Sequence, residues 1–315
     1  MACNVDFGLR SASVGDCHAA VPTRDRGYDT GAKAMSRIAV IMTCHNRRDT
    51  TVASLRSLAA SATPLNGLEC TVYLTDDGST DGTDRAVSDL GLPVVIIRGN
   101  GDLFWNRGMV RSWSTAVAQR HQFDGFLLLN DDTTLDRRAL SVLLETDRLY
   151  GANAVIVGAT RDPVTGNVTY GGVRRTSSWH PGRTARLSIS NEPQDADAFN
   201  ANCVYVPRAV YEAVGMLDPT FQHGIGDFDY GYRVKKRGKR IIVAPGTIGT
   251  CARNDATGTW RDNGVPIRRR LALLESPKGL PRRQWASFLR KHGAPFPALL
   301  AWAPTLQVLR SGRRW

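Results

Sequence analysis

The chain has few cysteines, and none of them is spaced for a metal site. Its 315 residues contain six, with no C-x-x-C pair among them. They are too scattered for a zinc site or for a dense disulfide framework. Free thiols in a reducing cytoplasm are therefore expected. The six are Cys3, Cys17, Cys44, Cys70, Cys203 and Cys251.

Long apolar runs are also missing. No stretch reaches the roughly 18 apolar residues that are needed to span a bilayer. The N-terminal stretch MACNVDFGLRSASVGDCHAAVPTRDRGYDTGAKA lacks the continuous apolar segment of a signal peptide. It is polar and has no clear periodicity, so residues 1–35 are predicted to be a disordered N-terminal extension. These absences favour a cytoplasmic location.

The positive charge of the chain is unevenly distributed. Residues 261–315 hold twelve Lys and Arg residues and two acids, a net charge of +10. Only +2 of the total of +12 is left for the first 260 residues. A basic nucleic-acid-binding protein would be expected to carry its charge on the folded face, and a crevice lined by acids would repel phosphates. That class is the weaker alternative, and no nucleic-acid partner is expected.

From residue 37 onward, strand patterns alternate with helix patterns. The β-branched run in RIAVIMTCHN (37–46) is followed by TTVASLRSLAASA (50–62), whose apolar positions recur at helical spacing. Such alternation predicts an α/β fold with a mainly parallel sheet that is covered on both faces. Further strands are predicted at 70–77, 93–98, 125–131 and 240–245, a strand leading into a helix at 204–215, helices at 81–91, 109–121, 137–150 and 227–238, and a hairpin at 166–179.

The loop after the first predicted strand, TCHNRRDT (43–50), contains no glycine. A nucleotidyltransferase on a similar sheet would normally carry a Gly-rich phosphate loop there, and so would a dinucleotide-binding dehydrogenase. The missing glycine counts against both classes, and the nucleotidyltransferase is kept as the nearest enzyme alternative.

Pairs of acids follow two of the predicted strands. Asp76 and Asp77 end one strand, and Asp131 and Asp132 follow another. Parallel α/β sheets bind ligands outside the carboxyl ends of their strands, and carboxylates are the natural ligands of Mg²⁺ and Mn²⁺. One such pair can equally be a turn former or a helix cap. Two pairs in one sheet favour a site for a divalent cation.

Four blocks of the sequence resemble the family 2 glycosyltransferases, in order and in spacing. They are VIMTCHNR (40–47), LTDDGSTDGT (74–83), LLLNDDT (127–133) and GDFDYGYR (226–233). The resemblance implies the GT-A fold, an α/β fold with a mainly parallel sheet and a small antiparallel acceptor-side part. Two more stretches, GDLFWNRGM (101–109) and GMLDPTF (215–221), are most similar to rhamnosyltransferase-like bacterial members.

The resemblance also implies a division of the chain and a set of nucleotide-binding residues. The GT-A domain is expected at residues 36–260, and residues 261–315 form a basic, aromatic-containing C-terminal segment. Thr43, Asn46 and Arg47 lie in the loop that lines the nucleotide pocket in the family. Asp76 and Asp77 match the acids that hydrogen-bond the base and the ribose, and a carboxylate can accept from a pyrimidine N3–H or a ribose hydroxyl.

Further donor-site residues come from three other segments. Trp105 and Asn106 are expected to shape the donor or acceptor pocket, and Asp131 to contact the donor. Arg253 is expected to contact the diphosphate, because a guanidinium matches phosphate bidentately. A solvated surface arginine is the alternative for Arg253.

The metal shell and the catalytic base follow from the same resemblance. Asp132 matches the metal ligand of the family's D-x-D motif. Many members complete the shell with a downstream His, which GTCARND (249–255) lacks, so His223 is the candidate substitute and a structural histidine the alternative. Asp227 matches the catalytic base of inverting members, and Asp229 is expected to orient Asp227 or the acceptor.

Two segments depart from the family or leave their role open. Where the family has a Glu-Asp pair before the base, this chain has Gly226-Asp227, so one acid is missing. Asn200 and Asn202 precede a predicted strand, and either could reach the sugar or the acceptor or be an ordinary turn asparagine.

The implied function is transfer of a sugar from a nucleoside-diphosphate donor to an acceptor hydroxyl, with inversion and with Mn²⁺ or Mg²⁺ as cofactor. The expected donor is a UDP- or dTDP-sugar rather than a GDP-sugar. The expected pathways are synthesis of cell-surface polysaccharide, glycolipid or glycosylated natural products.

The C-terminal segment suggests contact with a membrane. PRRQWASFLRKHG (281–293) interleaves basic and aromatic residues, and PALLAWAPTLQVL (297–309) is apolar but too short to span. Both are predicted to lie on the anionic inner face of a membrane, with Trp285, Phe288 and Trp302 in the interface. This position would suit a lipid-linked acceptor glycan. The alternative is a C-terminal helix packed on the catalytic domain with a solvated basic face.

Overall fold

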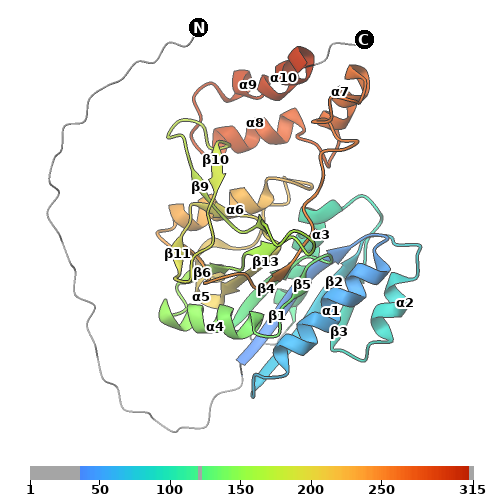
Figure 1. The fold of residues 1–315 in the computed structure, drawn as a ribbon, viewed down its shortest axis with the longest axis vertical. Coiled ribbons are helices and arrows are strands. Elements are labelled where there is room, and N and C mark those ends of the chain that lie inside the picture. Colours follow the sequence, from blue (N-terminus) through green and yellow to red (C-terminus); the bar gives the residue numbers. More distant parts are fainter. Residues whose placement is uncertain (1–35, 120–122, 312–315) are drawn as a thin grey trace, which may run out of the picture. The chain divides into compact units, whose positions relative to one another are not determined.

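The computed structural model of the protein describes residues 36–119 and 123–311 (Figure 1). The predicted disordered extension, residues 1–35, lies outside this part of the chain. Residues 36–311 belong to one compact unit.

A mixed eight-stranded sheet forms the centre of the described chain (Figure 1). Its strand order is β11-β14-β6-β13-β4-β1-β2-β3. The β4-β1-β2-β3 half is parallel throughout, whereas β13 runs antiparallel to both of its neighbours. The strands are β1 (Ser36–Cys44), β2 (Leu68–Asp76), β3 (Val94–Arg98), β4 (Gly125–Leu129), β6 (Ala154–Val157), β11 (Gln194–Asp195), β13 (Cys203–Pro207) and β14 (Arg240–Val243).

Helices cover both faces of this sheet, because successive side chains of a strand point to opposite faces. Along β1, Ala39 and Ile41 pack into one core and Ile38, Val40 and Met42 into the other. The first core lies against α3, α5 and α6, and the second against α1, α2 and α4. These helices are α1 (Arg48–Ala62), α2 (Thr83–Ser88), α3 (Phe104–Ala118), α4 (Ala139–Leu149), α5 (Arg208–Val214) and α6 (Gly226–Lys236).

The strand and helix predictions are confirmed within a few residues, with two differences. Helix α3 begins at Phe104 instead of at residue 109, because the Asp77 carboxylate accepts hydrogen bonds from the first backbone amides of this helix. The segment 166–179 contains β8 (Val168–Tyr170) and β9 (Gly172–Arg175), which pair with other strands in two different sheets. They do not form the predicted hairpin with each other.

Two small sheets stand beside the large one. One is antiparallel, with the order β10-β9-β12, and the other has the order β5-β15-β7-β8. The first carries the small antiparallel part expected of a GT-A fold. Their remaining strands are β5 (Thr134–Leu135), β7 (Thr160–Arg161), β10 (Thr184–Arg186), β12 (Ala198–Phe199) and β15 (Gly249–Thr250).

Four helices follow the last strand: α7 (Ile267–Glu275), α8 (Arg282–Lys291), α9 (Pro297–Leu300) and α10 (Ala303–Ser311). Helix α8 buries Trp285 and Phe288, which share a core with Phe221 and Tyr232. The prediction that Trp285 and Phe288 enter a membrane interface is therefore wrong, because both rings are buried: Phe288 packs against Tyr232 of α6, and Trp285 packs between Phe288 and His180. In residues 36–119 and 123–311, no helix is both long enough and apolar enough to span a bilayer.

Candidate active site

The acids predicted for the site come together at one edge of the large sheet. Strands β1, β2 and β4 are parallel neighbours, and Cys44 at the end of β1 pairs with Asp76 at the end of β2. Asn130, Asp131 and Asp132 follow the end of β4 on the other side of β1. The carboxyl ends of parallel strands meet at the same edge, which is where α/β sheets bind ligands.

The two acids after β2 have different surroundings. Asp77 accepts hydrogen bonds from the backbone amides of Gly101, Leu103 and Phe104 at 2.8, 2.9 and 3.0 Å. Its carboxylate thus holds the start of α3 and has little capacity left for a ligand. Asp76 accepts one bond, from the Ser79 amide at 2.9 Å. Of the two, Asp76 is the better placed to accept a bond from a bound base.

Thr43 and Asn46 connect the loops after β1 and β2. The Thr43 hydroxyl donates to the Thr75 carbonyl at 3.0 Å, and the side chain is buried. Asn46 has a positive φ of 50°, which asparagine tolerates better than most residues. Its side-chain oxygen accepts from the Thr80 amide at 2.7 Å. Both residues therefore shape the rim of the site through contacts with the backbone.

Arg47 forms an ion pair with both acids that follow β4. Its Nη1 lies 2.6 Å from Asp132 Oδ2 and 3.4 Å from Asp131 Oδ1. Burial raises the pKa of Asp131 to about 7 even though Arg47 opposes the rise. About half of the Arg47 side chain is exposed, so it can leave the acids without unfolding anything else. Arg47 therefore supplies the positive charge near this acid pair.

Asp227 lies in the first turn of α6, partly buried. It accepts from the backbone amides of Phe228 at 2.9 Å and Ala201 at 3.4 Å. Burial nevertheless raises its pKa to about 6. A carboxylate with a pKa close to neutral is suited to take up and release a proton at physiological pH.

A short loop connects Asp227 to the acids after β4. Ala201 donates to Asp227, and its neighbour Asn202 accepts from the Asn130 amide at 3.0 Å. The Asn202 side chain also lies 3.4 Å from the sulfur of Cys251. Asn202 therefore positions the backbone and a neighbouring thiol, a role that its sequence context left open.

Close packing at the start of α6 explains the missing acid of the Glu-Asp pair. A Cβ atom added to Gly226 would lie 1.8 Å from the side-chain oxygen of Asn106. Asn106 is fully buried and donates to the carbonyls of Asp218 and Phe221 at 2.8 and 2.7 Å. The Asn106 side chain fills the space that a residue larger than glycine would need at position 226. It does not line an open surface, so its role in shaping the donor or acceptor pocket, which stays a prediction, would be indirect.

Asp229 has no exposed surface and is surrounded by cations. Arg233 and Lys291 lie 2.8 and 2.7 Å from its carboxylate, and His292 Nε2 lies 2.9 Å away. Burial alone would raise the pKa of Asp229, but hydrogen bonds from these three residues lower it to about 2. In this placement Asp229 joins α6 to α8, and its carboxylate is occupied by these three residues. That it orients Asp227 or the acceptor stays a prediction.

A divalent cation would find one carboxylate pair here, Asp131 and Asp132. Among residues 36–119 and 123–311, no three His, Cys, Asp or Glu side chains are grouped to hold a metal by themselves. The Cys251 sulfur lies 3.5 Å from Asp132 Oδ1, and burial raises the pKa of this thiol to about 12, so it is neutral and donates to the carboxylate. The carboxylates fit Mg²⁺ or Mn²⁺, which usually bind one or two carboxylates and complete their shell with substrate phosphates and water, whereas a thiol is a poor ligand for these hard cations.

His223 is not grouped with the acids as a metal ligand. Its Nδ1 accepts a long hydrogen bond, 3.4 Å, from the backbone amide of Trp105. Burial lowers its pKa to about 4, helped by the positive charges of Lys278 and Arg47, so the imidazole is neutral. The hydrogen-bonded structural role that was the alternative for His223 describes its position.

Two more predicted residues border the acids. The Trp105 indole donates to the Asn130 side chain at 2.8 Å, which supports its predicted place at the pocket. Arg253 is exposed in the loop after β15. Next to Arg253, the Asn254 amide donates to the Tyr170 hydroxyl at 3.0 Å. Tyr170 and Cys251 were not predicted as site residues, because no family motif marks a tyrosine or a cysteine at these positions and only the fold brings them near Asp132.

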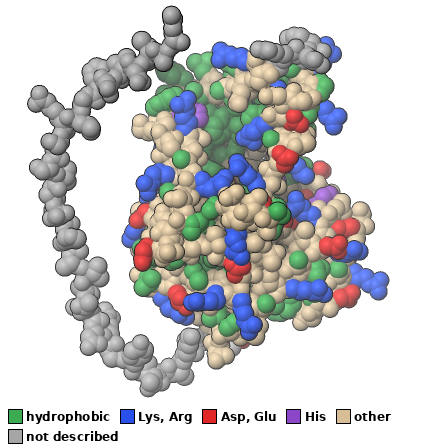
Figure 2. Space-filling view, in the orientation of Figure 1, with side chains coloured by type: hydrophobic (Ala, Val, Ile, Leu, Met, Phe, Trp, Pro, Cys, Tyr) green, Lys and Arg blue, Asp and Glu red, His purple; other side chains and the backbone are tan. Residues whose placement is uncertain are grey.

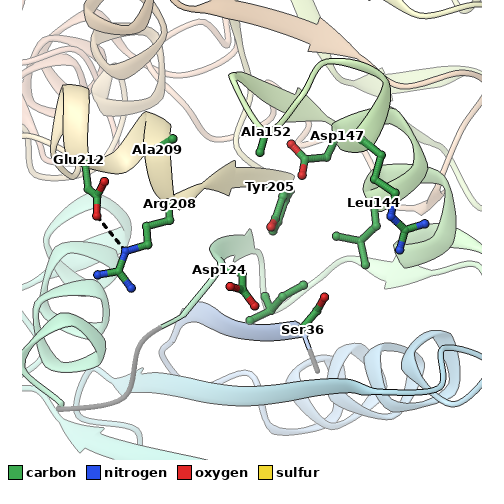
Figure 3. Close-up of a pocket in the computed structure, with 11 residues that line it drawn as sticks. Ser36, Asp124, Leu144, Asp147, Ala152, Tyr205, Arg208, Ala209 and Glu212 are labelled. Carbon is green, nitrogen blue, oxygen red and sulfur yellow. Dashed lines mark hydrogen bonds and ion pairs between the residues drawn. The ribbon is translucent and has the colours of Figure 1, made fainter. Parts of the chain in front are cut away.

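A cavity of about 460 Å³ opens at the other end of the sheet (Figure 3). It lies at the start of β1 and β4, and Ser36, Asp124, Asp147 and Tyr205 line it. Because β1 is nine residues long, this end is about 26 Å from the carboxyl ends of the strands. Its lining includes an ion pair between Arg208 and Glu212. The cavity is therefore separate from the acids of the predicted site.

Comparison with known proteins gives a family and a fold. Residues 39–212, more than half of the chain, match the family described as glycosyl transferase family 2. No curated protein matches the chain.

Solved structures with a similar fold include three transferases. A mannosyltransferase from Pyrobaculum calidifontis, in complex with GDP-Man and Mn²⁺, is 19% identical with a TM-score of 0.54, covering 87% of this chain and 72% of that one. GalNAc-T7 with UDP, GalNAc and Mn²⁺ is 14% identical with a TM-score of 0.53, and the match covers 90% of this chain and 58% of that one. TarS 1–349 from S. aureus is 12% identical with a TM-score of 0.52, covering 88% and 81%.

At these identities the structures support the GT-A fold alone, and the similarity to rhamnosyltransferase-like members stays a prediction. The family rests on the sequence match and agrees with the four blocks quoted above. The chain therefore belongs to glycosyl transferase family 2.

Proposed function

We propose that the protein transfers a sugar from a nucleoside-diphosphate donor to an acceptor hydroxyl with inversion, and that Asp227 is the base. The observation that carries this proposal is the Asp227 carboxyl, with a pKa raised to about 6, held by the same 201–202 loop that contacts Asn130. The loop thus connects the proposed base with the acids proposed to face the donor diphosphate.

The proposed reaction is a single displacement. The acceptor hydroxyl loses its proton to the Asp227 carboxylate while its oxygen forms a bond to the anomeric carbon. The bond between that carbon and the diphosphate breaks, and its electron pair stays on the diphosphate oxygen. A single base is enough for this step, which is consistent with the absence of a second acid at Gly226.

The leaving diphosphate is proposed to sit beside Asp131, Asp132 and Arg47. Mn²⁺ or Mg²⁺ bound there would neutralise charge that grows on the leaving group. Arg47 neutralises the two acids in the free protein, and its half-exposed side chain can turn to the diphosphate when the donor arrives. Asp132 is the protein group proposed to face the cation, and the Cys251 thiol donates to its carboxylate.

The donor is proposed to be a UDP- or dTDP-sugar, deoxyhexose donors included. A pyrimidine N3–H can donate to the carboxylate of Asp76, which accepts only one bond from the described part of the protein. The two stretches similar to rhamnosyltransferase-like members, 101–109 and 215–221, support the deoxyhexose. Asn106 of the first stretch donates to the carbonyls of Asp218 and Phe221 in the second and lies beside Gly226 at the start of α6.

A thermal-shift panel of UDP-, dTDP- and GDP-sugars, each with Mn²⁺ or with a chelator, tests the proposal. A donor at 100 times its Kd stabilises by about 2.7 kcal/mol, or roughly 4–5 °C in a chain of this size. The shift should require metal and should be lost in Asp132→Asn. Asp49→Asn is the control, because that side chain is 86% exposed on α1.

Two outcomes would contradict parts of the proposal. Equal shifts of the melting temperature in chelator and in Mn²⁺ would show that donor binding needs no cation, and would reject the proposed cation at Asp132. A shift with GDP-sugars alone would reject the pyrimidine donor while leaving the reaction class intact.

A further inference from the structure

Five large apolar side chains are exposed along one short stretch near the C-terminus. The exposed fractions are 75% for Phe296, 71% for Leu299, 47% for Trp302, 47% for Leu306 and 41% for Leu309. These five make up half of the ten large apolar residues that are exposed in the described chain. Exposed apolar residues normally occur singly over a surface, so their concentration in residues 296–309 calls for a physical reason.

Helical spacing puts three of these side chains on one face, and Phe296 and Leu299 precede them beside and within α9. Trp302, Leu306 and Leu309 recur at i, i+4 and i+7, and the Leu306 amide donates to the Trp302 carbonyl at 3.0 Å, so this turn is helical. Val308 points to the other side, where it is fully buried against Ile267 of α7. Helix α10 therefore packs on the protein with one face and presents an apolar stripe with the other.

Two arginines border this stripe, and further cations are exposed on the same C-terminal segment. The guanidinium of Arg282 lies over the Trp302 ring, 3.9 Å from its centre, and Arg310 is exposed beside Leu309. Figure 2 shows Lys and Arg side chains around the end of the molecule that carries α7–α10. The exposed cations of this segment are Arg261, Arg268, Arg269, Lys278, Arg283, Arg290 and Arg310.

We propose that this surface, the five apolar side chains of residues 296–309 with their surrounding cations, docks on an anionic lipid bilayer. A helix with an apolar face and Arg residues at its border lies in the plane of a membrane surface, with the apolar face in the headgroup boundary. Each cation near an anionic leaflet adds to the attraction. The tryptophan and arginine pair at Trp302 suits this boundary, because an indole is amphipathic.

A second copy of the chain fits this surface less well. At about 100 Å² exposed for each side chain, the stripe offers about 500 Å², against the roughly 800 Å² per partner in a stable interface. Two copies would also bring together two segments that each carry a net charge of +10 over residues 261–315. An anionic surface removes this repulsion, whereas a second copy adds to it.

Vesicle binding by the full chain tests the proposal. The protein should bind vesicles of phosphatidylglycerol and phosphatidylcholine at low salt, at least tenfold more weakly to phosphatidylcholine alone, and less well as salt rises. Leu306→Asp should weaken binding at least tenfold, and Arg310→Gln about fivefold. Leu149→Asp is the matched control, because Leu149 is 76% exposed on α4 and lies outside the stripe.

Fluorescence quenching by brominated phospholipid in the same vesicles gives a readout specific to position. Quenching should be largely lost in Trp302→Phe and retained in Trp179→Phe. The two tryptophans are a matched pair, because Trp302 is 47% exposed in the parent chain and Trp179 is 46% exposed. Full quenching in Trp302→Phe would overturn the proposal, as would unchanged vesicle binding by Leu306→Asp. So would a concentration-dependent dimer that Leu306→Asp dissolves, which would assign the stripe to a second copy. Sugar transfer to a soluble acceptor is measured without vesicles. Failure of the proposed enzymatic function can therefore be distinguished from failure of the proposed membrane binding.

Discussion

Replacing Asp227 by asparagine is expected to remove most of the turnover and at the same time to make the folded protein more stable. Asparagine keeps the shape of the side chain, and its oxygen can still accept from the Phe228 amide. It cannot take up the acceptor proton, and general-base catalysis typically contributes about 10²–10⁴-fold. Turnover should fall by that factor, while donor binding should change little because Asp76 and Asp132 are untouched.

The gain in stability follows from the pKa of Asp227. Its folded-state pKa of about 6 lies above the ordinary 3.8, so the folded state binds the proton more tightly than the unfolded chain does. Ionisation therefore costs stability as pH rises from about 4 to 6, and the cost is complete above that range. The difference corresponds to about 3 kcal/mol at pH 8 and to about half of that at pH 5. The asparagine variant is free of this cost.

Denaturant unfolding at pH 5 and pH 8, beside sugar-transfer kinetics, checks both parts. The free energy of unfolding of the variant should exceed that of the parent by up to about 3 kcal/mol at pH 8, and by less at pH 5. The parent's kcat/KM should fall tenfold per pH unit below about pH 6, which the residual activity of the variant should not do. Asp49→Asn, an exposed acid, should change neither quantity. Near-normal turnover by Asp227→Asn would refute the assignment of the base, and weak donor binding would move this residue into the donor site.

Three other changes test the surroundings of the site. Asp229→Asn should cost about 3–5 kcal/mol of stability, because it leaves buried cations without their partner, and thermal melting should show the loss while correctly folded protein keeps donor affinity. Arg47→Gln should bind Mn²⁺ more tightly than the parent in the absence of donor, because no 2.6 Å ion pair must break at Asp132. Calorimetry checks this, with Arg48→Gln as the control. Equal affinities of variant and parent would mean that Arg47 does not compete with the cation. Cys251→Asp places a third carboxylate beside Asp131 and Asp132, so it should melt lower than the parent in chelator and recover in Mn²⁺, and a Mn²⁺-independent melting temperature would reject a cation at this site.

Some of the fold and much of the site were predictable from local patterns. The β-branched runs and the helical spacing of apolar residues predicted the parallel half of the sheet. Strands that are buried on both faces are apolar along their length, and the helices that cover them repeat apolar residues every three or four positions. The acids after β2 and β4 were recognisable for a related reason. Carboxylates do not follow a fully buried strand unless the sheet ends there, so Asp76, Asp131 and Asp132 mark one edge of the sheet.

The roles of individual polar residues depended on partners that are distant in sequence. Asp77 caps a helix 27 residues further along, and Asp229 is neutralised by residues from α8 more than 60 positions away. Asn106 occupies the space beside Gly226. In each case the side chain alone is compatible with catalysis, and only the burial and the hydrogen-bond partners show that it supports the structure.

The C-terminal segment illustrates the same division. Its composition by itself predicted an amphipathic surface, because basic and aromatic residues alternate there. Which aromatics are free was decided by tertiary packing, since Trp285 and Phe288 fill a core shared with α6 while Trp302 stays half exposed. The sequence determined where apolar and charged groups lie along the chain. The tertiary structure decided which of these groups are buried or paired inside the protein and which stay available for a partner. A contact between distant segments removes a side chain from solvent without changing any local sequence pattern.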